Sequence, residues 1–327
     1  MRFNRLDLNL LVALEALLLE KSITRAGRRL NLSQSATSGV LSRLREYFAD
    51  ELLVPVGRSM ELTPLALSLI DPVRNVLLQI KATIEIKPAF DPATVFRNFK
   101  ITASDYVTTV LLSEMACRLP MVAPNIKIEI SAPDEIFHEA IERGEIDLII
   151  MPKQYLRGVH PKEVLFTEDY SCVVWTGNTA IGDTLNMETY MSLGHVSTMF
   201  GHFSQMSFEE VVLQATGHER RIEVTTDNFT TLPHMVIGTN RIATMHSRLA
   251  RLFARYYPVR LLPLPFDLPA MEFAMQWNRF FDNDPSHQWL RNLAKQACDA
   301  KKDSPSATAI ATADSEARIS APETLVT

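Results

Sequence analysis

The chain has 327 residues, a formal net charge of -5 and a sequence pI of about 5.9, and 46% of its residues are hydrophobic. This length suffices for two or three domains with sizeable cores. The acidic balance excludes a general nucleic-acid coat, so any contact with DNA must be confined to a local patch.

The three cysteines are far apart and show no CxxC spacing, which predicts neither a zinc site nor a disulfide framework. No metal and no other cofactor is implied. The N-terminus does not resemble a signal peptide, and no run of about 18 apolar residues is present. We therefore expect a protein of the reducing cytoplasm, without a membrane span, that associates with the nucleoid if it binds DNA.

Following a first amphipathic helix over residues 6–21, the stretch from Ser22 to Arg45 carries five arginines and no acidic residue. A basic block inside an acidic chain indicates a local anionic partner. Ser22 and Ser33 can each cap a short helix whose apolar residues recur at helical spacing, and residues 31–32 form the turn between them. This pattern predicts a helix-turn-helix whose second helix lies in a DNA major groove.

Two short strands are predicted next, at residues 52–54 and 60–62, around the sequence VGRS at 56–59. They would form a β wing with Arg58 near its tip. A basic wing tip contacts phosphate or a minor groove, and the alternative is a plain surface arginine.

A helix over residues 64–86 begins with Thr63 as its cap and Pro64 at its first position. Its apolar face is long and lacks a partner beyond the small domain, so we expect it to pair with a second copy of the chain. Pro72 predicts a kink or a restart. The prolines of residues 87–92 end this helix, and we place a domain boundary there.

Strand and helix patterns alternate from residue 96 onward, which predicts an α/β region with a parallel sheet. The expected strands cover residues 99–103, 126–130, 146–151, 170–175, 195–198, 221–225, 242–244, 259–264 and 272–277. The expected helices cover residues 106–119, 134–143, 187–191, 208–216, 232–238, 247–256 and 285–298.

The predicted domains are a winged helix-turn-helix (residues 1–63), a linker and dimerisation helix (64–90) and an effector-binding α/β domain (91–302). The last would consist of two halves, residues 91–166 with 272–302 and residues 167–271, because the chain crosses between them twice. The remainder, residues 303–327, is rich in Ala, Ser, Thr and Pro and is expected to be disordered.

A cleft between the two halves is the default ligand site. Ser104 and Asp105 lie where a strand meets a helix N-terminus, which suits a carboxylate or phenolate, although an ordinary helix cap without a ligand is the alternative. No GxSxG, HExxH, P-loop or GxGxxG motif supports an enzyme. A solute-binding protein is disfavoured by the N-terminal basic module.

The N-terminal residues DLNLL at 7–11, LSQSA at 32–36 and LTP at 62–64 resemble the winged helix-turn-helix of LysR-type transcriptional regulators. GEIDL at 144–148, GHV at 194–196, IAT at 242–244 and WLR at 289–291 are similar to the subgroup of nodulation activators (NodD) and salicylate-responsive regulators (NahR). This likeness covers all but the tail. It implies a winged helix-turn-helix, a long linker helix, and a sensor of two subdomains resembling a periplasmic binding protein.

The resemblance also assigns the residues that contact double-stranded promoter DNA. Departures from the family are Ser35 in place of a usual proline and Pro55 in place of an arginine that often begins the wing. Gly39 inside the recognition helix either allows a close approach to the DNA backbone or is a tolerated surface glycine. The candidate DNA-binding residues are Arg25, Arg28, Ser33, Gln34, Ser35, Thr37, Ser38, Arg43 and Arg58.

The resemblance further implies a homodimer or homotetramer, a small aromatic effector, and RNA polymerase as a partner. We expect an activator of an aromatic-catabolic or nodulation operon; the alternative is a repressor, or a regulator with a non-aromatic organic acid as effector. The histidines among the candidates align with positions that line the family's cleft, and structural histidines are the alternative. The candidate effector-binding residues are Ser104, Asp105, Tyr106, His195, Phe203, His234 and Trp277.

Overall fold

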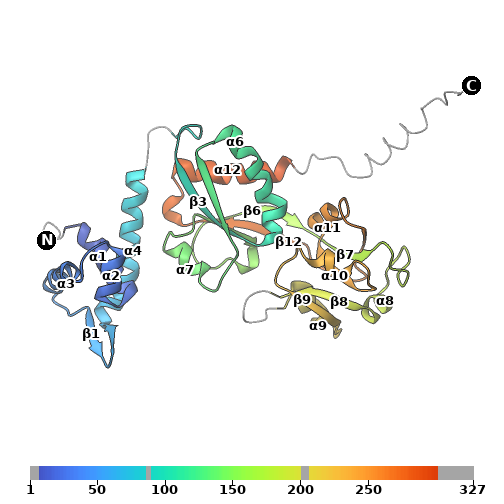
Figure 1. Cartoon of the computed structure of the whole chain (residues 1–327), viewed down its shortest axis with the longest axis horizontal. Coiled ribbons are helices and arrows are strands. Elements are labelled where there is room, and N and C mark those ends of the chain that lie inside the picture. The colour runs from blue at the N-terminus through green and yellow to red at the C-terminus, as the bar shows by residue number, and fades with distance from the viewer. Residues whose placement is uncertain (1–6, 86–89, 200–205, 301–327) are drawn as a thin grey trace, which may run out of the picture. The chain divides into compact units, whose positions relative to one another are not determined.

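A computed structural model describes residues 7–85, 90–199 and 206–300 of the chain. The chain divides into two compact units, residues 1–89 and 90–327, each with its own hydrophobic core (Figure 1). The expected disordered tail and Phe203 lie outside the described residues. Within the described ranges, no helix is long and apolar enough to cross a membrane.

Four helices and one hairpin make up residues 7–85, the described part of the first unit, and their core gathers leucines from α1, α3 and the hairpin. Leu14, Leu17, Leu41 and Leu44 are almost completely buried there. Helical spacing places these leucines on one face of each helix, so burying them fixes how the helices pack. The elements are α1 (Asn9–Glu20), α2 (Ile23–Arg29), α3 (Gln34–Phe48), β1 (Leu53–Val56), β2 (Ser59–Leu62) and α4 (Pro64–Glu85).

The expected helix caps are confirmed, because the hydroxyls of Ser22, Ser33 and Thr63 each accept a hydrogen bond from the backbone N–H three residues ahead. The Thr63 hydroxyl also donates to Asp50 Oδ1 at 2.6 Å, which ties the start of α4 to the base of the hairpin. Helix α4 continues through Pro72 as one element, so of the predicted kink or restart the restart is wrong and the kink stays a prediction. Pro72 lies on the exposed side of the helix, which leaves room for the proline ring.

Two lobes form the second unit, each built on a five-stranded sheet (Figure 1). The first sheet has the order β4-β3-β5-β12-β6 and the second has the order β11-β7-β10-β8-β9. The first sheet contains β3 (Arg97–Ala103), β4 (Ile126–Ser131), β5 (Leu148–Pro152), β6 (Lys162–Glu168) and β12 (Met271–Gln276). The second contains β7 (Tyr170–Trp175), β8 (Gly194–Thr198), β9 (Arg221–Thr226), β10 (Ile242–His246) and β11 (Val259–Leu262).

The expectation of parallel sheets holds only for three strands in each lobe. Strand β12 pairs antiparallel with both β5 and β6, and β7 pairs antiparallel with both β10 and β11. The sheets are mixed because the first strand after each crossing between the lobes, β7 or β12, runs against the parallel core of its sheet. Strand β6 was not predicted from the sequence, since its exposed edge carries lysine, glutamate and threonine among its apolar residues.

The helices of the second unit cover the faces of the two sheets. The helix predicted at 106–119 is divided into α5 (Asp105–Val107), a π-helical turn η2 (Thr108–Leu112) and α6 (Ser113–Val122). The others are α7 (Phe137–Glu142), α8 (Met187–Ser192), α9 (Phe208–Ala215), α10 (Leu232–Val236), α11 (Ser247–Phe253) and α12 (Pro285–Ala300), with 3-10 turns η3 (Lys153–Tyr155) and η4 (Arg279–Phe281).

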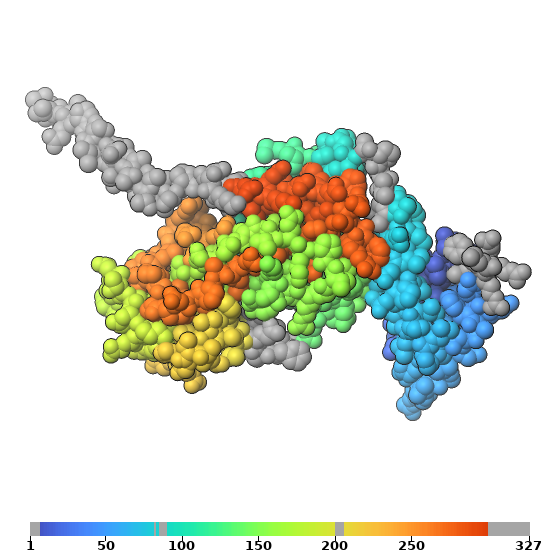
Figure 2. Space-filling model, turned by 180° about the vertical axis from the view of Figure 1, so that it is seen from behind, coloured from blue at the N-terminus to red at the C-terminus, as the bar shows by residue number. Residues whose placement is uncertain are grey.

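Helix α12 returns along the first lobe, where Figure 2 shows the red C-terminal segment lying against the green atoms of that lobe. Leu290, Ala294 and Ala297 are buried on its inner face. Lys295 Nζ lies 2.7 Å from Glu163 Oε1 on β6, so the last helix and the unpredicted strand are joined by an ion pair as well as by packing.

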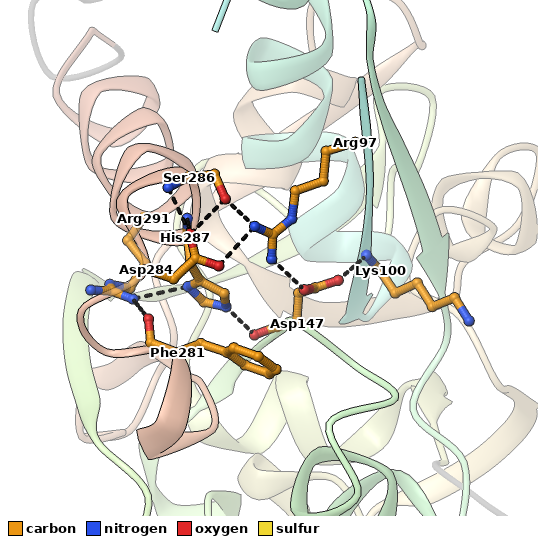
Figure 3. Close-up of polar contacts among 8 residues, drawn as sticks. All are labelled: Arg97, Lys100, Asp147, Phe281, Asp284, Ser286, His287 and Arg291. Carbon is orange, nitrogen blue, oxygen red and sulfur yellow. Dashed lines mark hydrogen bonds and ion pairs between the residues drawn. The ribbon is translucent and has the colours of Figure 1, made fainter. Parts of the chain in front are cut away.

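A buried polar network links the beginning of β3 to the beginning of α12 (Figure 3). Arg97 Nη1 lies 2.7 Å from Asp284 Oδ2, and its Nη2 lies 3.6 Å from Asp147 Oδ1. His287 Nε2 is 2.8 Å from the Asp147 carbonyl oxygen, and His287 Nδ1 is 2.9 Å from Arg291 Nη1. A guanidinium can only donate, so Nδ1 accepts, Nε2–H donates, and the imidazole is neutral.

Burial, with the neighbouring Arg291 charge, lowers the pKa of His287 from its ordinary value of 6.5 to about 4. The unfolded chain therefore binds more protons between about pH 6.5 and 4, and the free energy of unfolding falls as the pH drops through that window. This histidine alone should remove about 2 kcal/mol of stability between pH 7 and pH 5.

We predict that His287→Gln flattens the decline of thermal stability between pH 7 and pH 5. Thermal unfolding followed at pH 5, 6 and 7 measures this slope. His234→Gln, which removes an exposed histidine, is the matched control and keeps the wild-type slope. An unchanged slope in His287→Gln would show that His287 is not neutral in the native protein.

Candidate DNA-binding and effector-binding sites

The first turn of α3 carries an exposed polar surface. Gln34 and Ser35 are exposed at the beginning of the helix. The Ser33 and Ser35 hydroxyls lie 3.0 Å apart, and the Ser38 hydroxyl donates to the Gln34 carbonyl at 2.9 Å. These hydroxyls are therefore already hydrogen-bonded within the helix, whereas the carboxamide of Gln34 offers a donor and an acceptor outward.

Thr37 does not share this surface, although the sequence placed it among the DNA contacts. Its side chain is 0% exposed and its hydroxyl donates to the Ser33 carbonyl at 2.9 Å. A Cβ atom on Gly27 of α2 would lie only 2.8 Å from the Thr37 hydroxyl oxygen and 3.0 Å from the Leu32 carbonyl. Gly27 and Thr37 thus pack closely enough that only a glycine fits at position 27 without a shift of its neighbours.

Three of the candidate arginines project from the first unit. Arg28, Arg43 and Arg58 are exposed on α2, on α3 and in the hairpin turn. Arg25 is also exposed, but its Nε lies 3.2 Å from Glu20 Oε2 and its guanidinium reaches the Glu20 carbonyl. Part of its charge is therefore compensated locally, and the other three arginines are better placed for phosphate.

The predicted wing is present as the β1–β2 hairpin, with Val56 paired to Ser59 and only two residues in the turn. Gly57 has φ +63°, a conformation that favours glycine, and it leaves Arg58 at the tip. Arg45 holds the base of the wing to α3 by donating to two backbone carbonyls of the β1 side, at 2.8 and 2.7 Å. The wing is thus positioned by a side chain of the recognition helix.

Two of the predicted effector residues take part in contacts that join the lobes, Asp105 through its own hydrogen bond and Tyr106 through Glu168 and through its ring. Asp105 Oδ2 accepts a hydrogen bond from the backbone N–H of Thr230 at 2.8 Å, while Ser104 caps the same helix α5. The Tyr106 hydroxyl donates to Glu168, the last residue of β6. We call these contacts the interlobe junction.

Aromatic rings from both lobes surround His246 at the interlobe junction. Its ring centroid lies 4.2 Å from that of Tyr106, 4.7 Å from Phe229 and 4.8 Å from Tyr170. Burial lowers the pKa of His246 to about 3, so the imidazole is neutral.

The structure does not bring His195, His234 or Trp277 to this junction. His195 is 0% exposed within the second lobe, where its Nε2 is 2.8 Å from the Tyr190 carbonyl oxygen. Burial lowers its pKa to about 4. His234 is exposed on α10, edge-on to the Tyr257 ring.

Trp277 follows the end of β12 that pairs with the start of β5, which is the end away from the interlobe junction. Its indole N–H donates to Asp282 Oδ1 at 2.9 Å, and the Arg291 guanidinium covers its ring at 4.3 Å. The indole is therefore held by residues of its own lobe rather than presented to a ligand.

Sequence reasoning missed the residues that complete the junction, namely Glu168, Thr230, Arg248 and His246. Glu168 is 2% exposed, and its Oε2 lies 2.9 Å from Arg248 Nε. These residues are separated by 60 or more positions from Tyr106, and no local spacing could have connected them. The one available signal was the position of Glu168 and Asp169 at the expected crossing between halves.

Comparison with known proteins decides the family. Residues 8–67 match the model of the bacterial regulatory helix-turn-helix protein of the lysR family, and residues 95–299 match the LysR substrate binding domain. The chain is a LysR-type transcriptional regulator. As a member of this family it is a DNA-binding regulator of transcription and not an enzyme.

This LysR-type regulator is similar to nodulation protein D of Bradyrhizobium sp. (strain ANU 289), with 41% identity over 90% of this chain and 87% of that protein. It is 40% identical to nodulation protein D 2 of Rhizobium tropici over 90% of this chain and 94% of that protein. A solved structure of a probable transcriptional regulator from Pseudomonas aeruginosa matches with a TM-score of 0.61 and 25% identity, covering 90% of this chain and 97% of that one.

We predict opposite effects from an added methyl group at the two glycines of the helix-turn-helix. Gly27→Ala should lower the free energy of unfolding of the first unit by about 1–2 kcal/mol, because the methyl group overpacks the contact with Thr37. Gly39→Ala meets nothing within 4 Å and should raise stability by up to about 1 kcal/mol. Chemical denaturation of the two variants measures both effects.

The Gly39→Ala variant also decides between the two roles considered for Gly39, close approach of the DNA backbone and a tolerated surface glycine. If Gly39→Ala keeps its stability gain but loses DNA affinity, the glycine allows a close approach of the DNA backbone. Unchanged DNA affinity would identify it as a tolerated surface glycine.

Proposed function

We propose that this LysR-type regulator is an activator that binds promoter DNA through α3 and the wing and responds to a small aromatic or phenolic effector held between the lobes of its sensor. The single observation that carries the proposal is the interlobe junction, where Asp105 bonds to Thr230 of the other lobe and the Tyr106 ring packs on His246 of that lobe. A ligand bound there changes the relation of the lobes, because it must contact both.

The proposed DNA contacts divide into base reading and phosphate binding. Gln34 faces outward at the start of α3 and suits an adenine edge, with Ser35 and Ser38 as permissive neighbours. Arg28, Arg43 and Arg58, with Arg25 as a weaker candidate, bind phosphate. Ser33 acts chiefly as the helix cap.

An aromatic effector suits the ring-rich junction. A planar ligand would make stacked or edge-to-face contacts with the rings that surround His246. The Asp105 carboxylate would accept a hydrogen bond from a phenolic hydroxyl. The alternative is a non-aromatic organic acid, for which the free N–H groups beside Ser104 would be the main attraction. The operon is proposed to serve nodulation or aromatic catabolism; the names of the relatives favour nodulation.

A homodimer or homotetramer is proposed on the exposed apolar side chains of α4. Leu67 is 54% exposed, Val76 43% and Ile84 75%, and a groove on this helix is lined by Val76, Ile80 and Ile84. A second α4 would cover this face. We place the protein on the nucleoid in the cytoplasm, with RNA polymerase as its partner in activation.

We predict that Arg58→Ala weakens binding to the DNA upstream of the protein's own gene roughly tenfold and lowers the slope of log affinity against log salt by about one. Titrations at several stated salt concentrations measure both quantities. Lys153→Ala removes the same charge from an exposed residue of the sensor and is the matched control. No preference for this DNA over scrambled DNA of equal length would contradict the proposed operator.

We predict that a thermal-shift screen finds its hits among phenolics, flavonoids and aromatic acids. A ligand at a hundredfold excess over its Kd stabilises the native state by about 2.7 kcal/mol. Asp105→Asn should reduce the shift, whereas His195→Asn, altered inside the second lobe, should retain it. Hits confined to non-aromatic acids would support the alternative effector class.

A further inference from the structure

The interlobe junction contains more bonding than a ligand-binding surface requires. Two consecutive residues of α5 make polar contacts beyond their own helix: Asp105 reaches the Thr230 backbone, and Tyr106 reaches Glu168. The helix changes to the π-helical turn η2 after one more residue, at Thr108. Such turns are frequent at functional positions, because they reset the direction of the residues on either side.

Glu168 is the centre of these contacts. It ends β6 in the first lobe, and the chain reaches the second lobe two residues later, at β7. Its Oε1 accepts the backbone N–H of Arg248 at 3.0 Å, and its Oε2 accepts the Tyr106 hydroxyl and pairs with Arg248 Nε at 2.9 Å. The carboxylate therefore binds α5 of one lobe and the start of α11 of the other at the same time.

This arrangement of contacts makes separation of the two lobes energetically unfavourable. Glu168 is 2% exposed, so separating the lobes takes Arg248 away from a buried carboxylate that then keeps only the Tyr106 hydroxyl. The Tyr106 ring also packs against His246 and Phe229 of the second lobe, at 4.2 and 6.0 Å between centroids. The Tyr106 ring thus contacts the second lobe itself, and its hydroxyl holds the Glu168 carboxylate that pairs with Arg248 of that lobe.

We propose that Asp105, Tyr106, Glu168, Thr230 and Arg248 form an interlobe clasp that opens and closes as one unit, with Glu168 as its positioning residue. The clasp sets how often the lobes separate, and therefore how readily any ligand enters between them. It belongs to the chain itself and stands whether or not the proposed effector is the ligand.

Two backbone amides report on the clasp directly. The N–H of Thr230 is held by Asp105 and the N–H of Arg248 by Glu168, so hydrogen exchange at each requires its contact to open. If the clasp opens as one unit, weakening either contact accelerates exchange at both amides by the same factor. If the contacts fray separately, each variant accelerates only its own amide.

The experiment compares Asp105→Asn and Tyr106→Phe in the full chain, without DNA or any added ligand, by hydrogen exchange resolved to single amides. We expect each variant to accelerate both amides roughly tenfold, as the loss of one hydrogen bond to a charged group implies. Asp105 is only half-buried, so its isosteric variant folds even if Tyr106→Phe does not.

Tyr190→Phe is the matched control, because it removes an equally buried hydroxyl whose partners, Thr244 at 2.8 Å and Arg220 at 3.0 Å, lie within the second lobe. This variant should leave the hydrogen-exchange rates of the Thr230 and Arg248 amides unchanged relative to those of the other amides. Acceleration of a single amide per variant overturns the clasp. Equal acceleration of amides in the centres of β3 and β10 overturns it as well, since the contacts would then merely hold the fold.

Discussion

The ion pair between Glu168 and Arg248 is the interaction on which the sensor depends. A carboxylate that is almost completely buried is tolerable only with a cation and hydrogen-bond donors around it. Burial raises the pKa of Glu168, and the Tyr106 hydroxyl and the Arg248 backbone and guanidinium oppose that rise. These partners come from different lobes. The buried charge is therefore compensated only while the two lobes keep their relative position.

The same principle recurs inside each lobe, with a different consequence. Arg97 joins Asp284 within the first lobe, and Arg220 joins Glu210 at 2.5 Å within the second. These pairs link segments that are distant in sequence or fix a helix to its sheet, so they stabilise each lobe internally. The pair between Glu168 and Arg248 differs from them because it joins the two lobes.

Local features of the fold were predictable from the sequence, and its long-range contacts were not. Capping serines, a proline at the first helical position and helical leucine spacing located the helix-turn-helix and α4 because each signal acts over a few residues. Strand β6 was not predicted because its stability comes from pairing with β12, about a hundred residues later in the chain. Thr37 was misplaced for a related reason, since position in a helix does not reveal that Gly27 of the preceding helix faces it.

The candidate effector site illustrates the limit most clearly. A strand end followed by a helix cap predicted Ser104 and Asp105 as effector residues, but only the folded chain shows that Asp105 contacts Thr230 and that Tyr106 contacts Glu168. In the helix-turn-helix, the hydroxyls at the start of α3 mostly form hydrogen bonds within that helix and its cap. Few hydroxyls at the start of α3 therefore remain to read bases. Under the proposed function, a junction that restricts motion between the lobes is the part of the sensor where a ligand can change its geometry most.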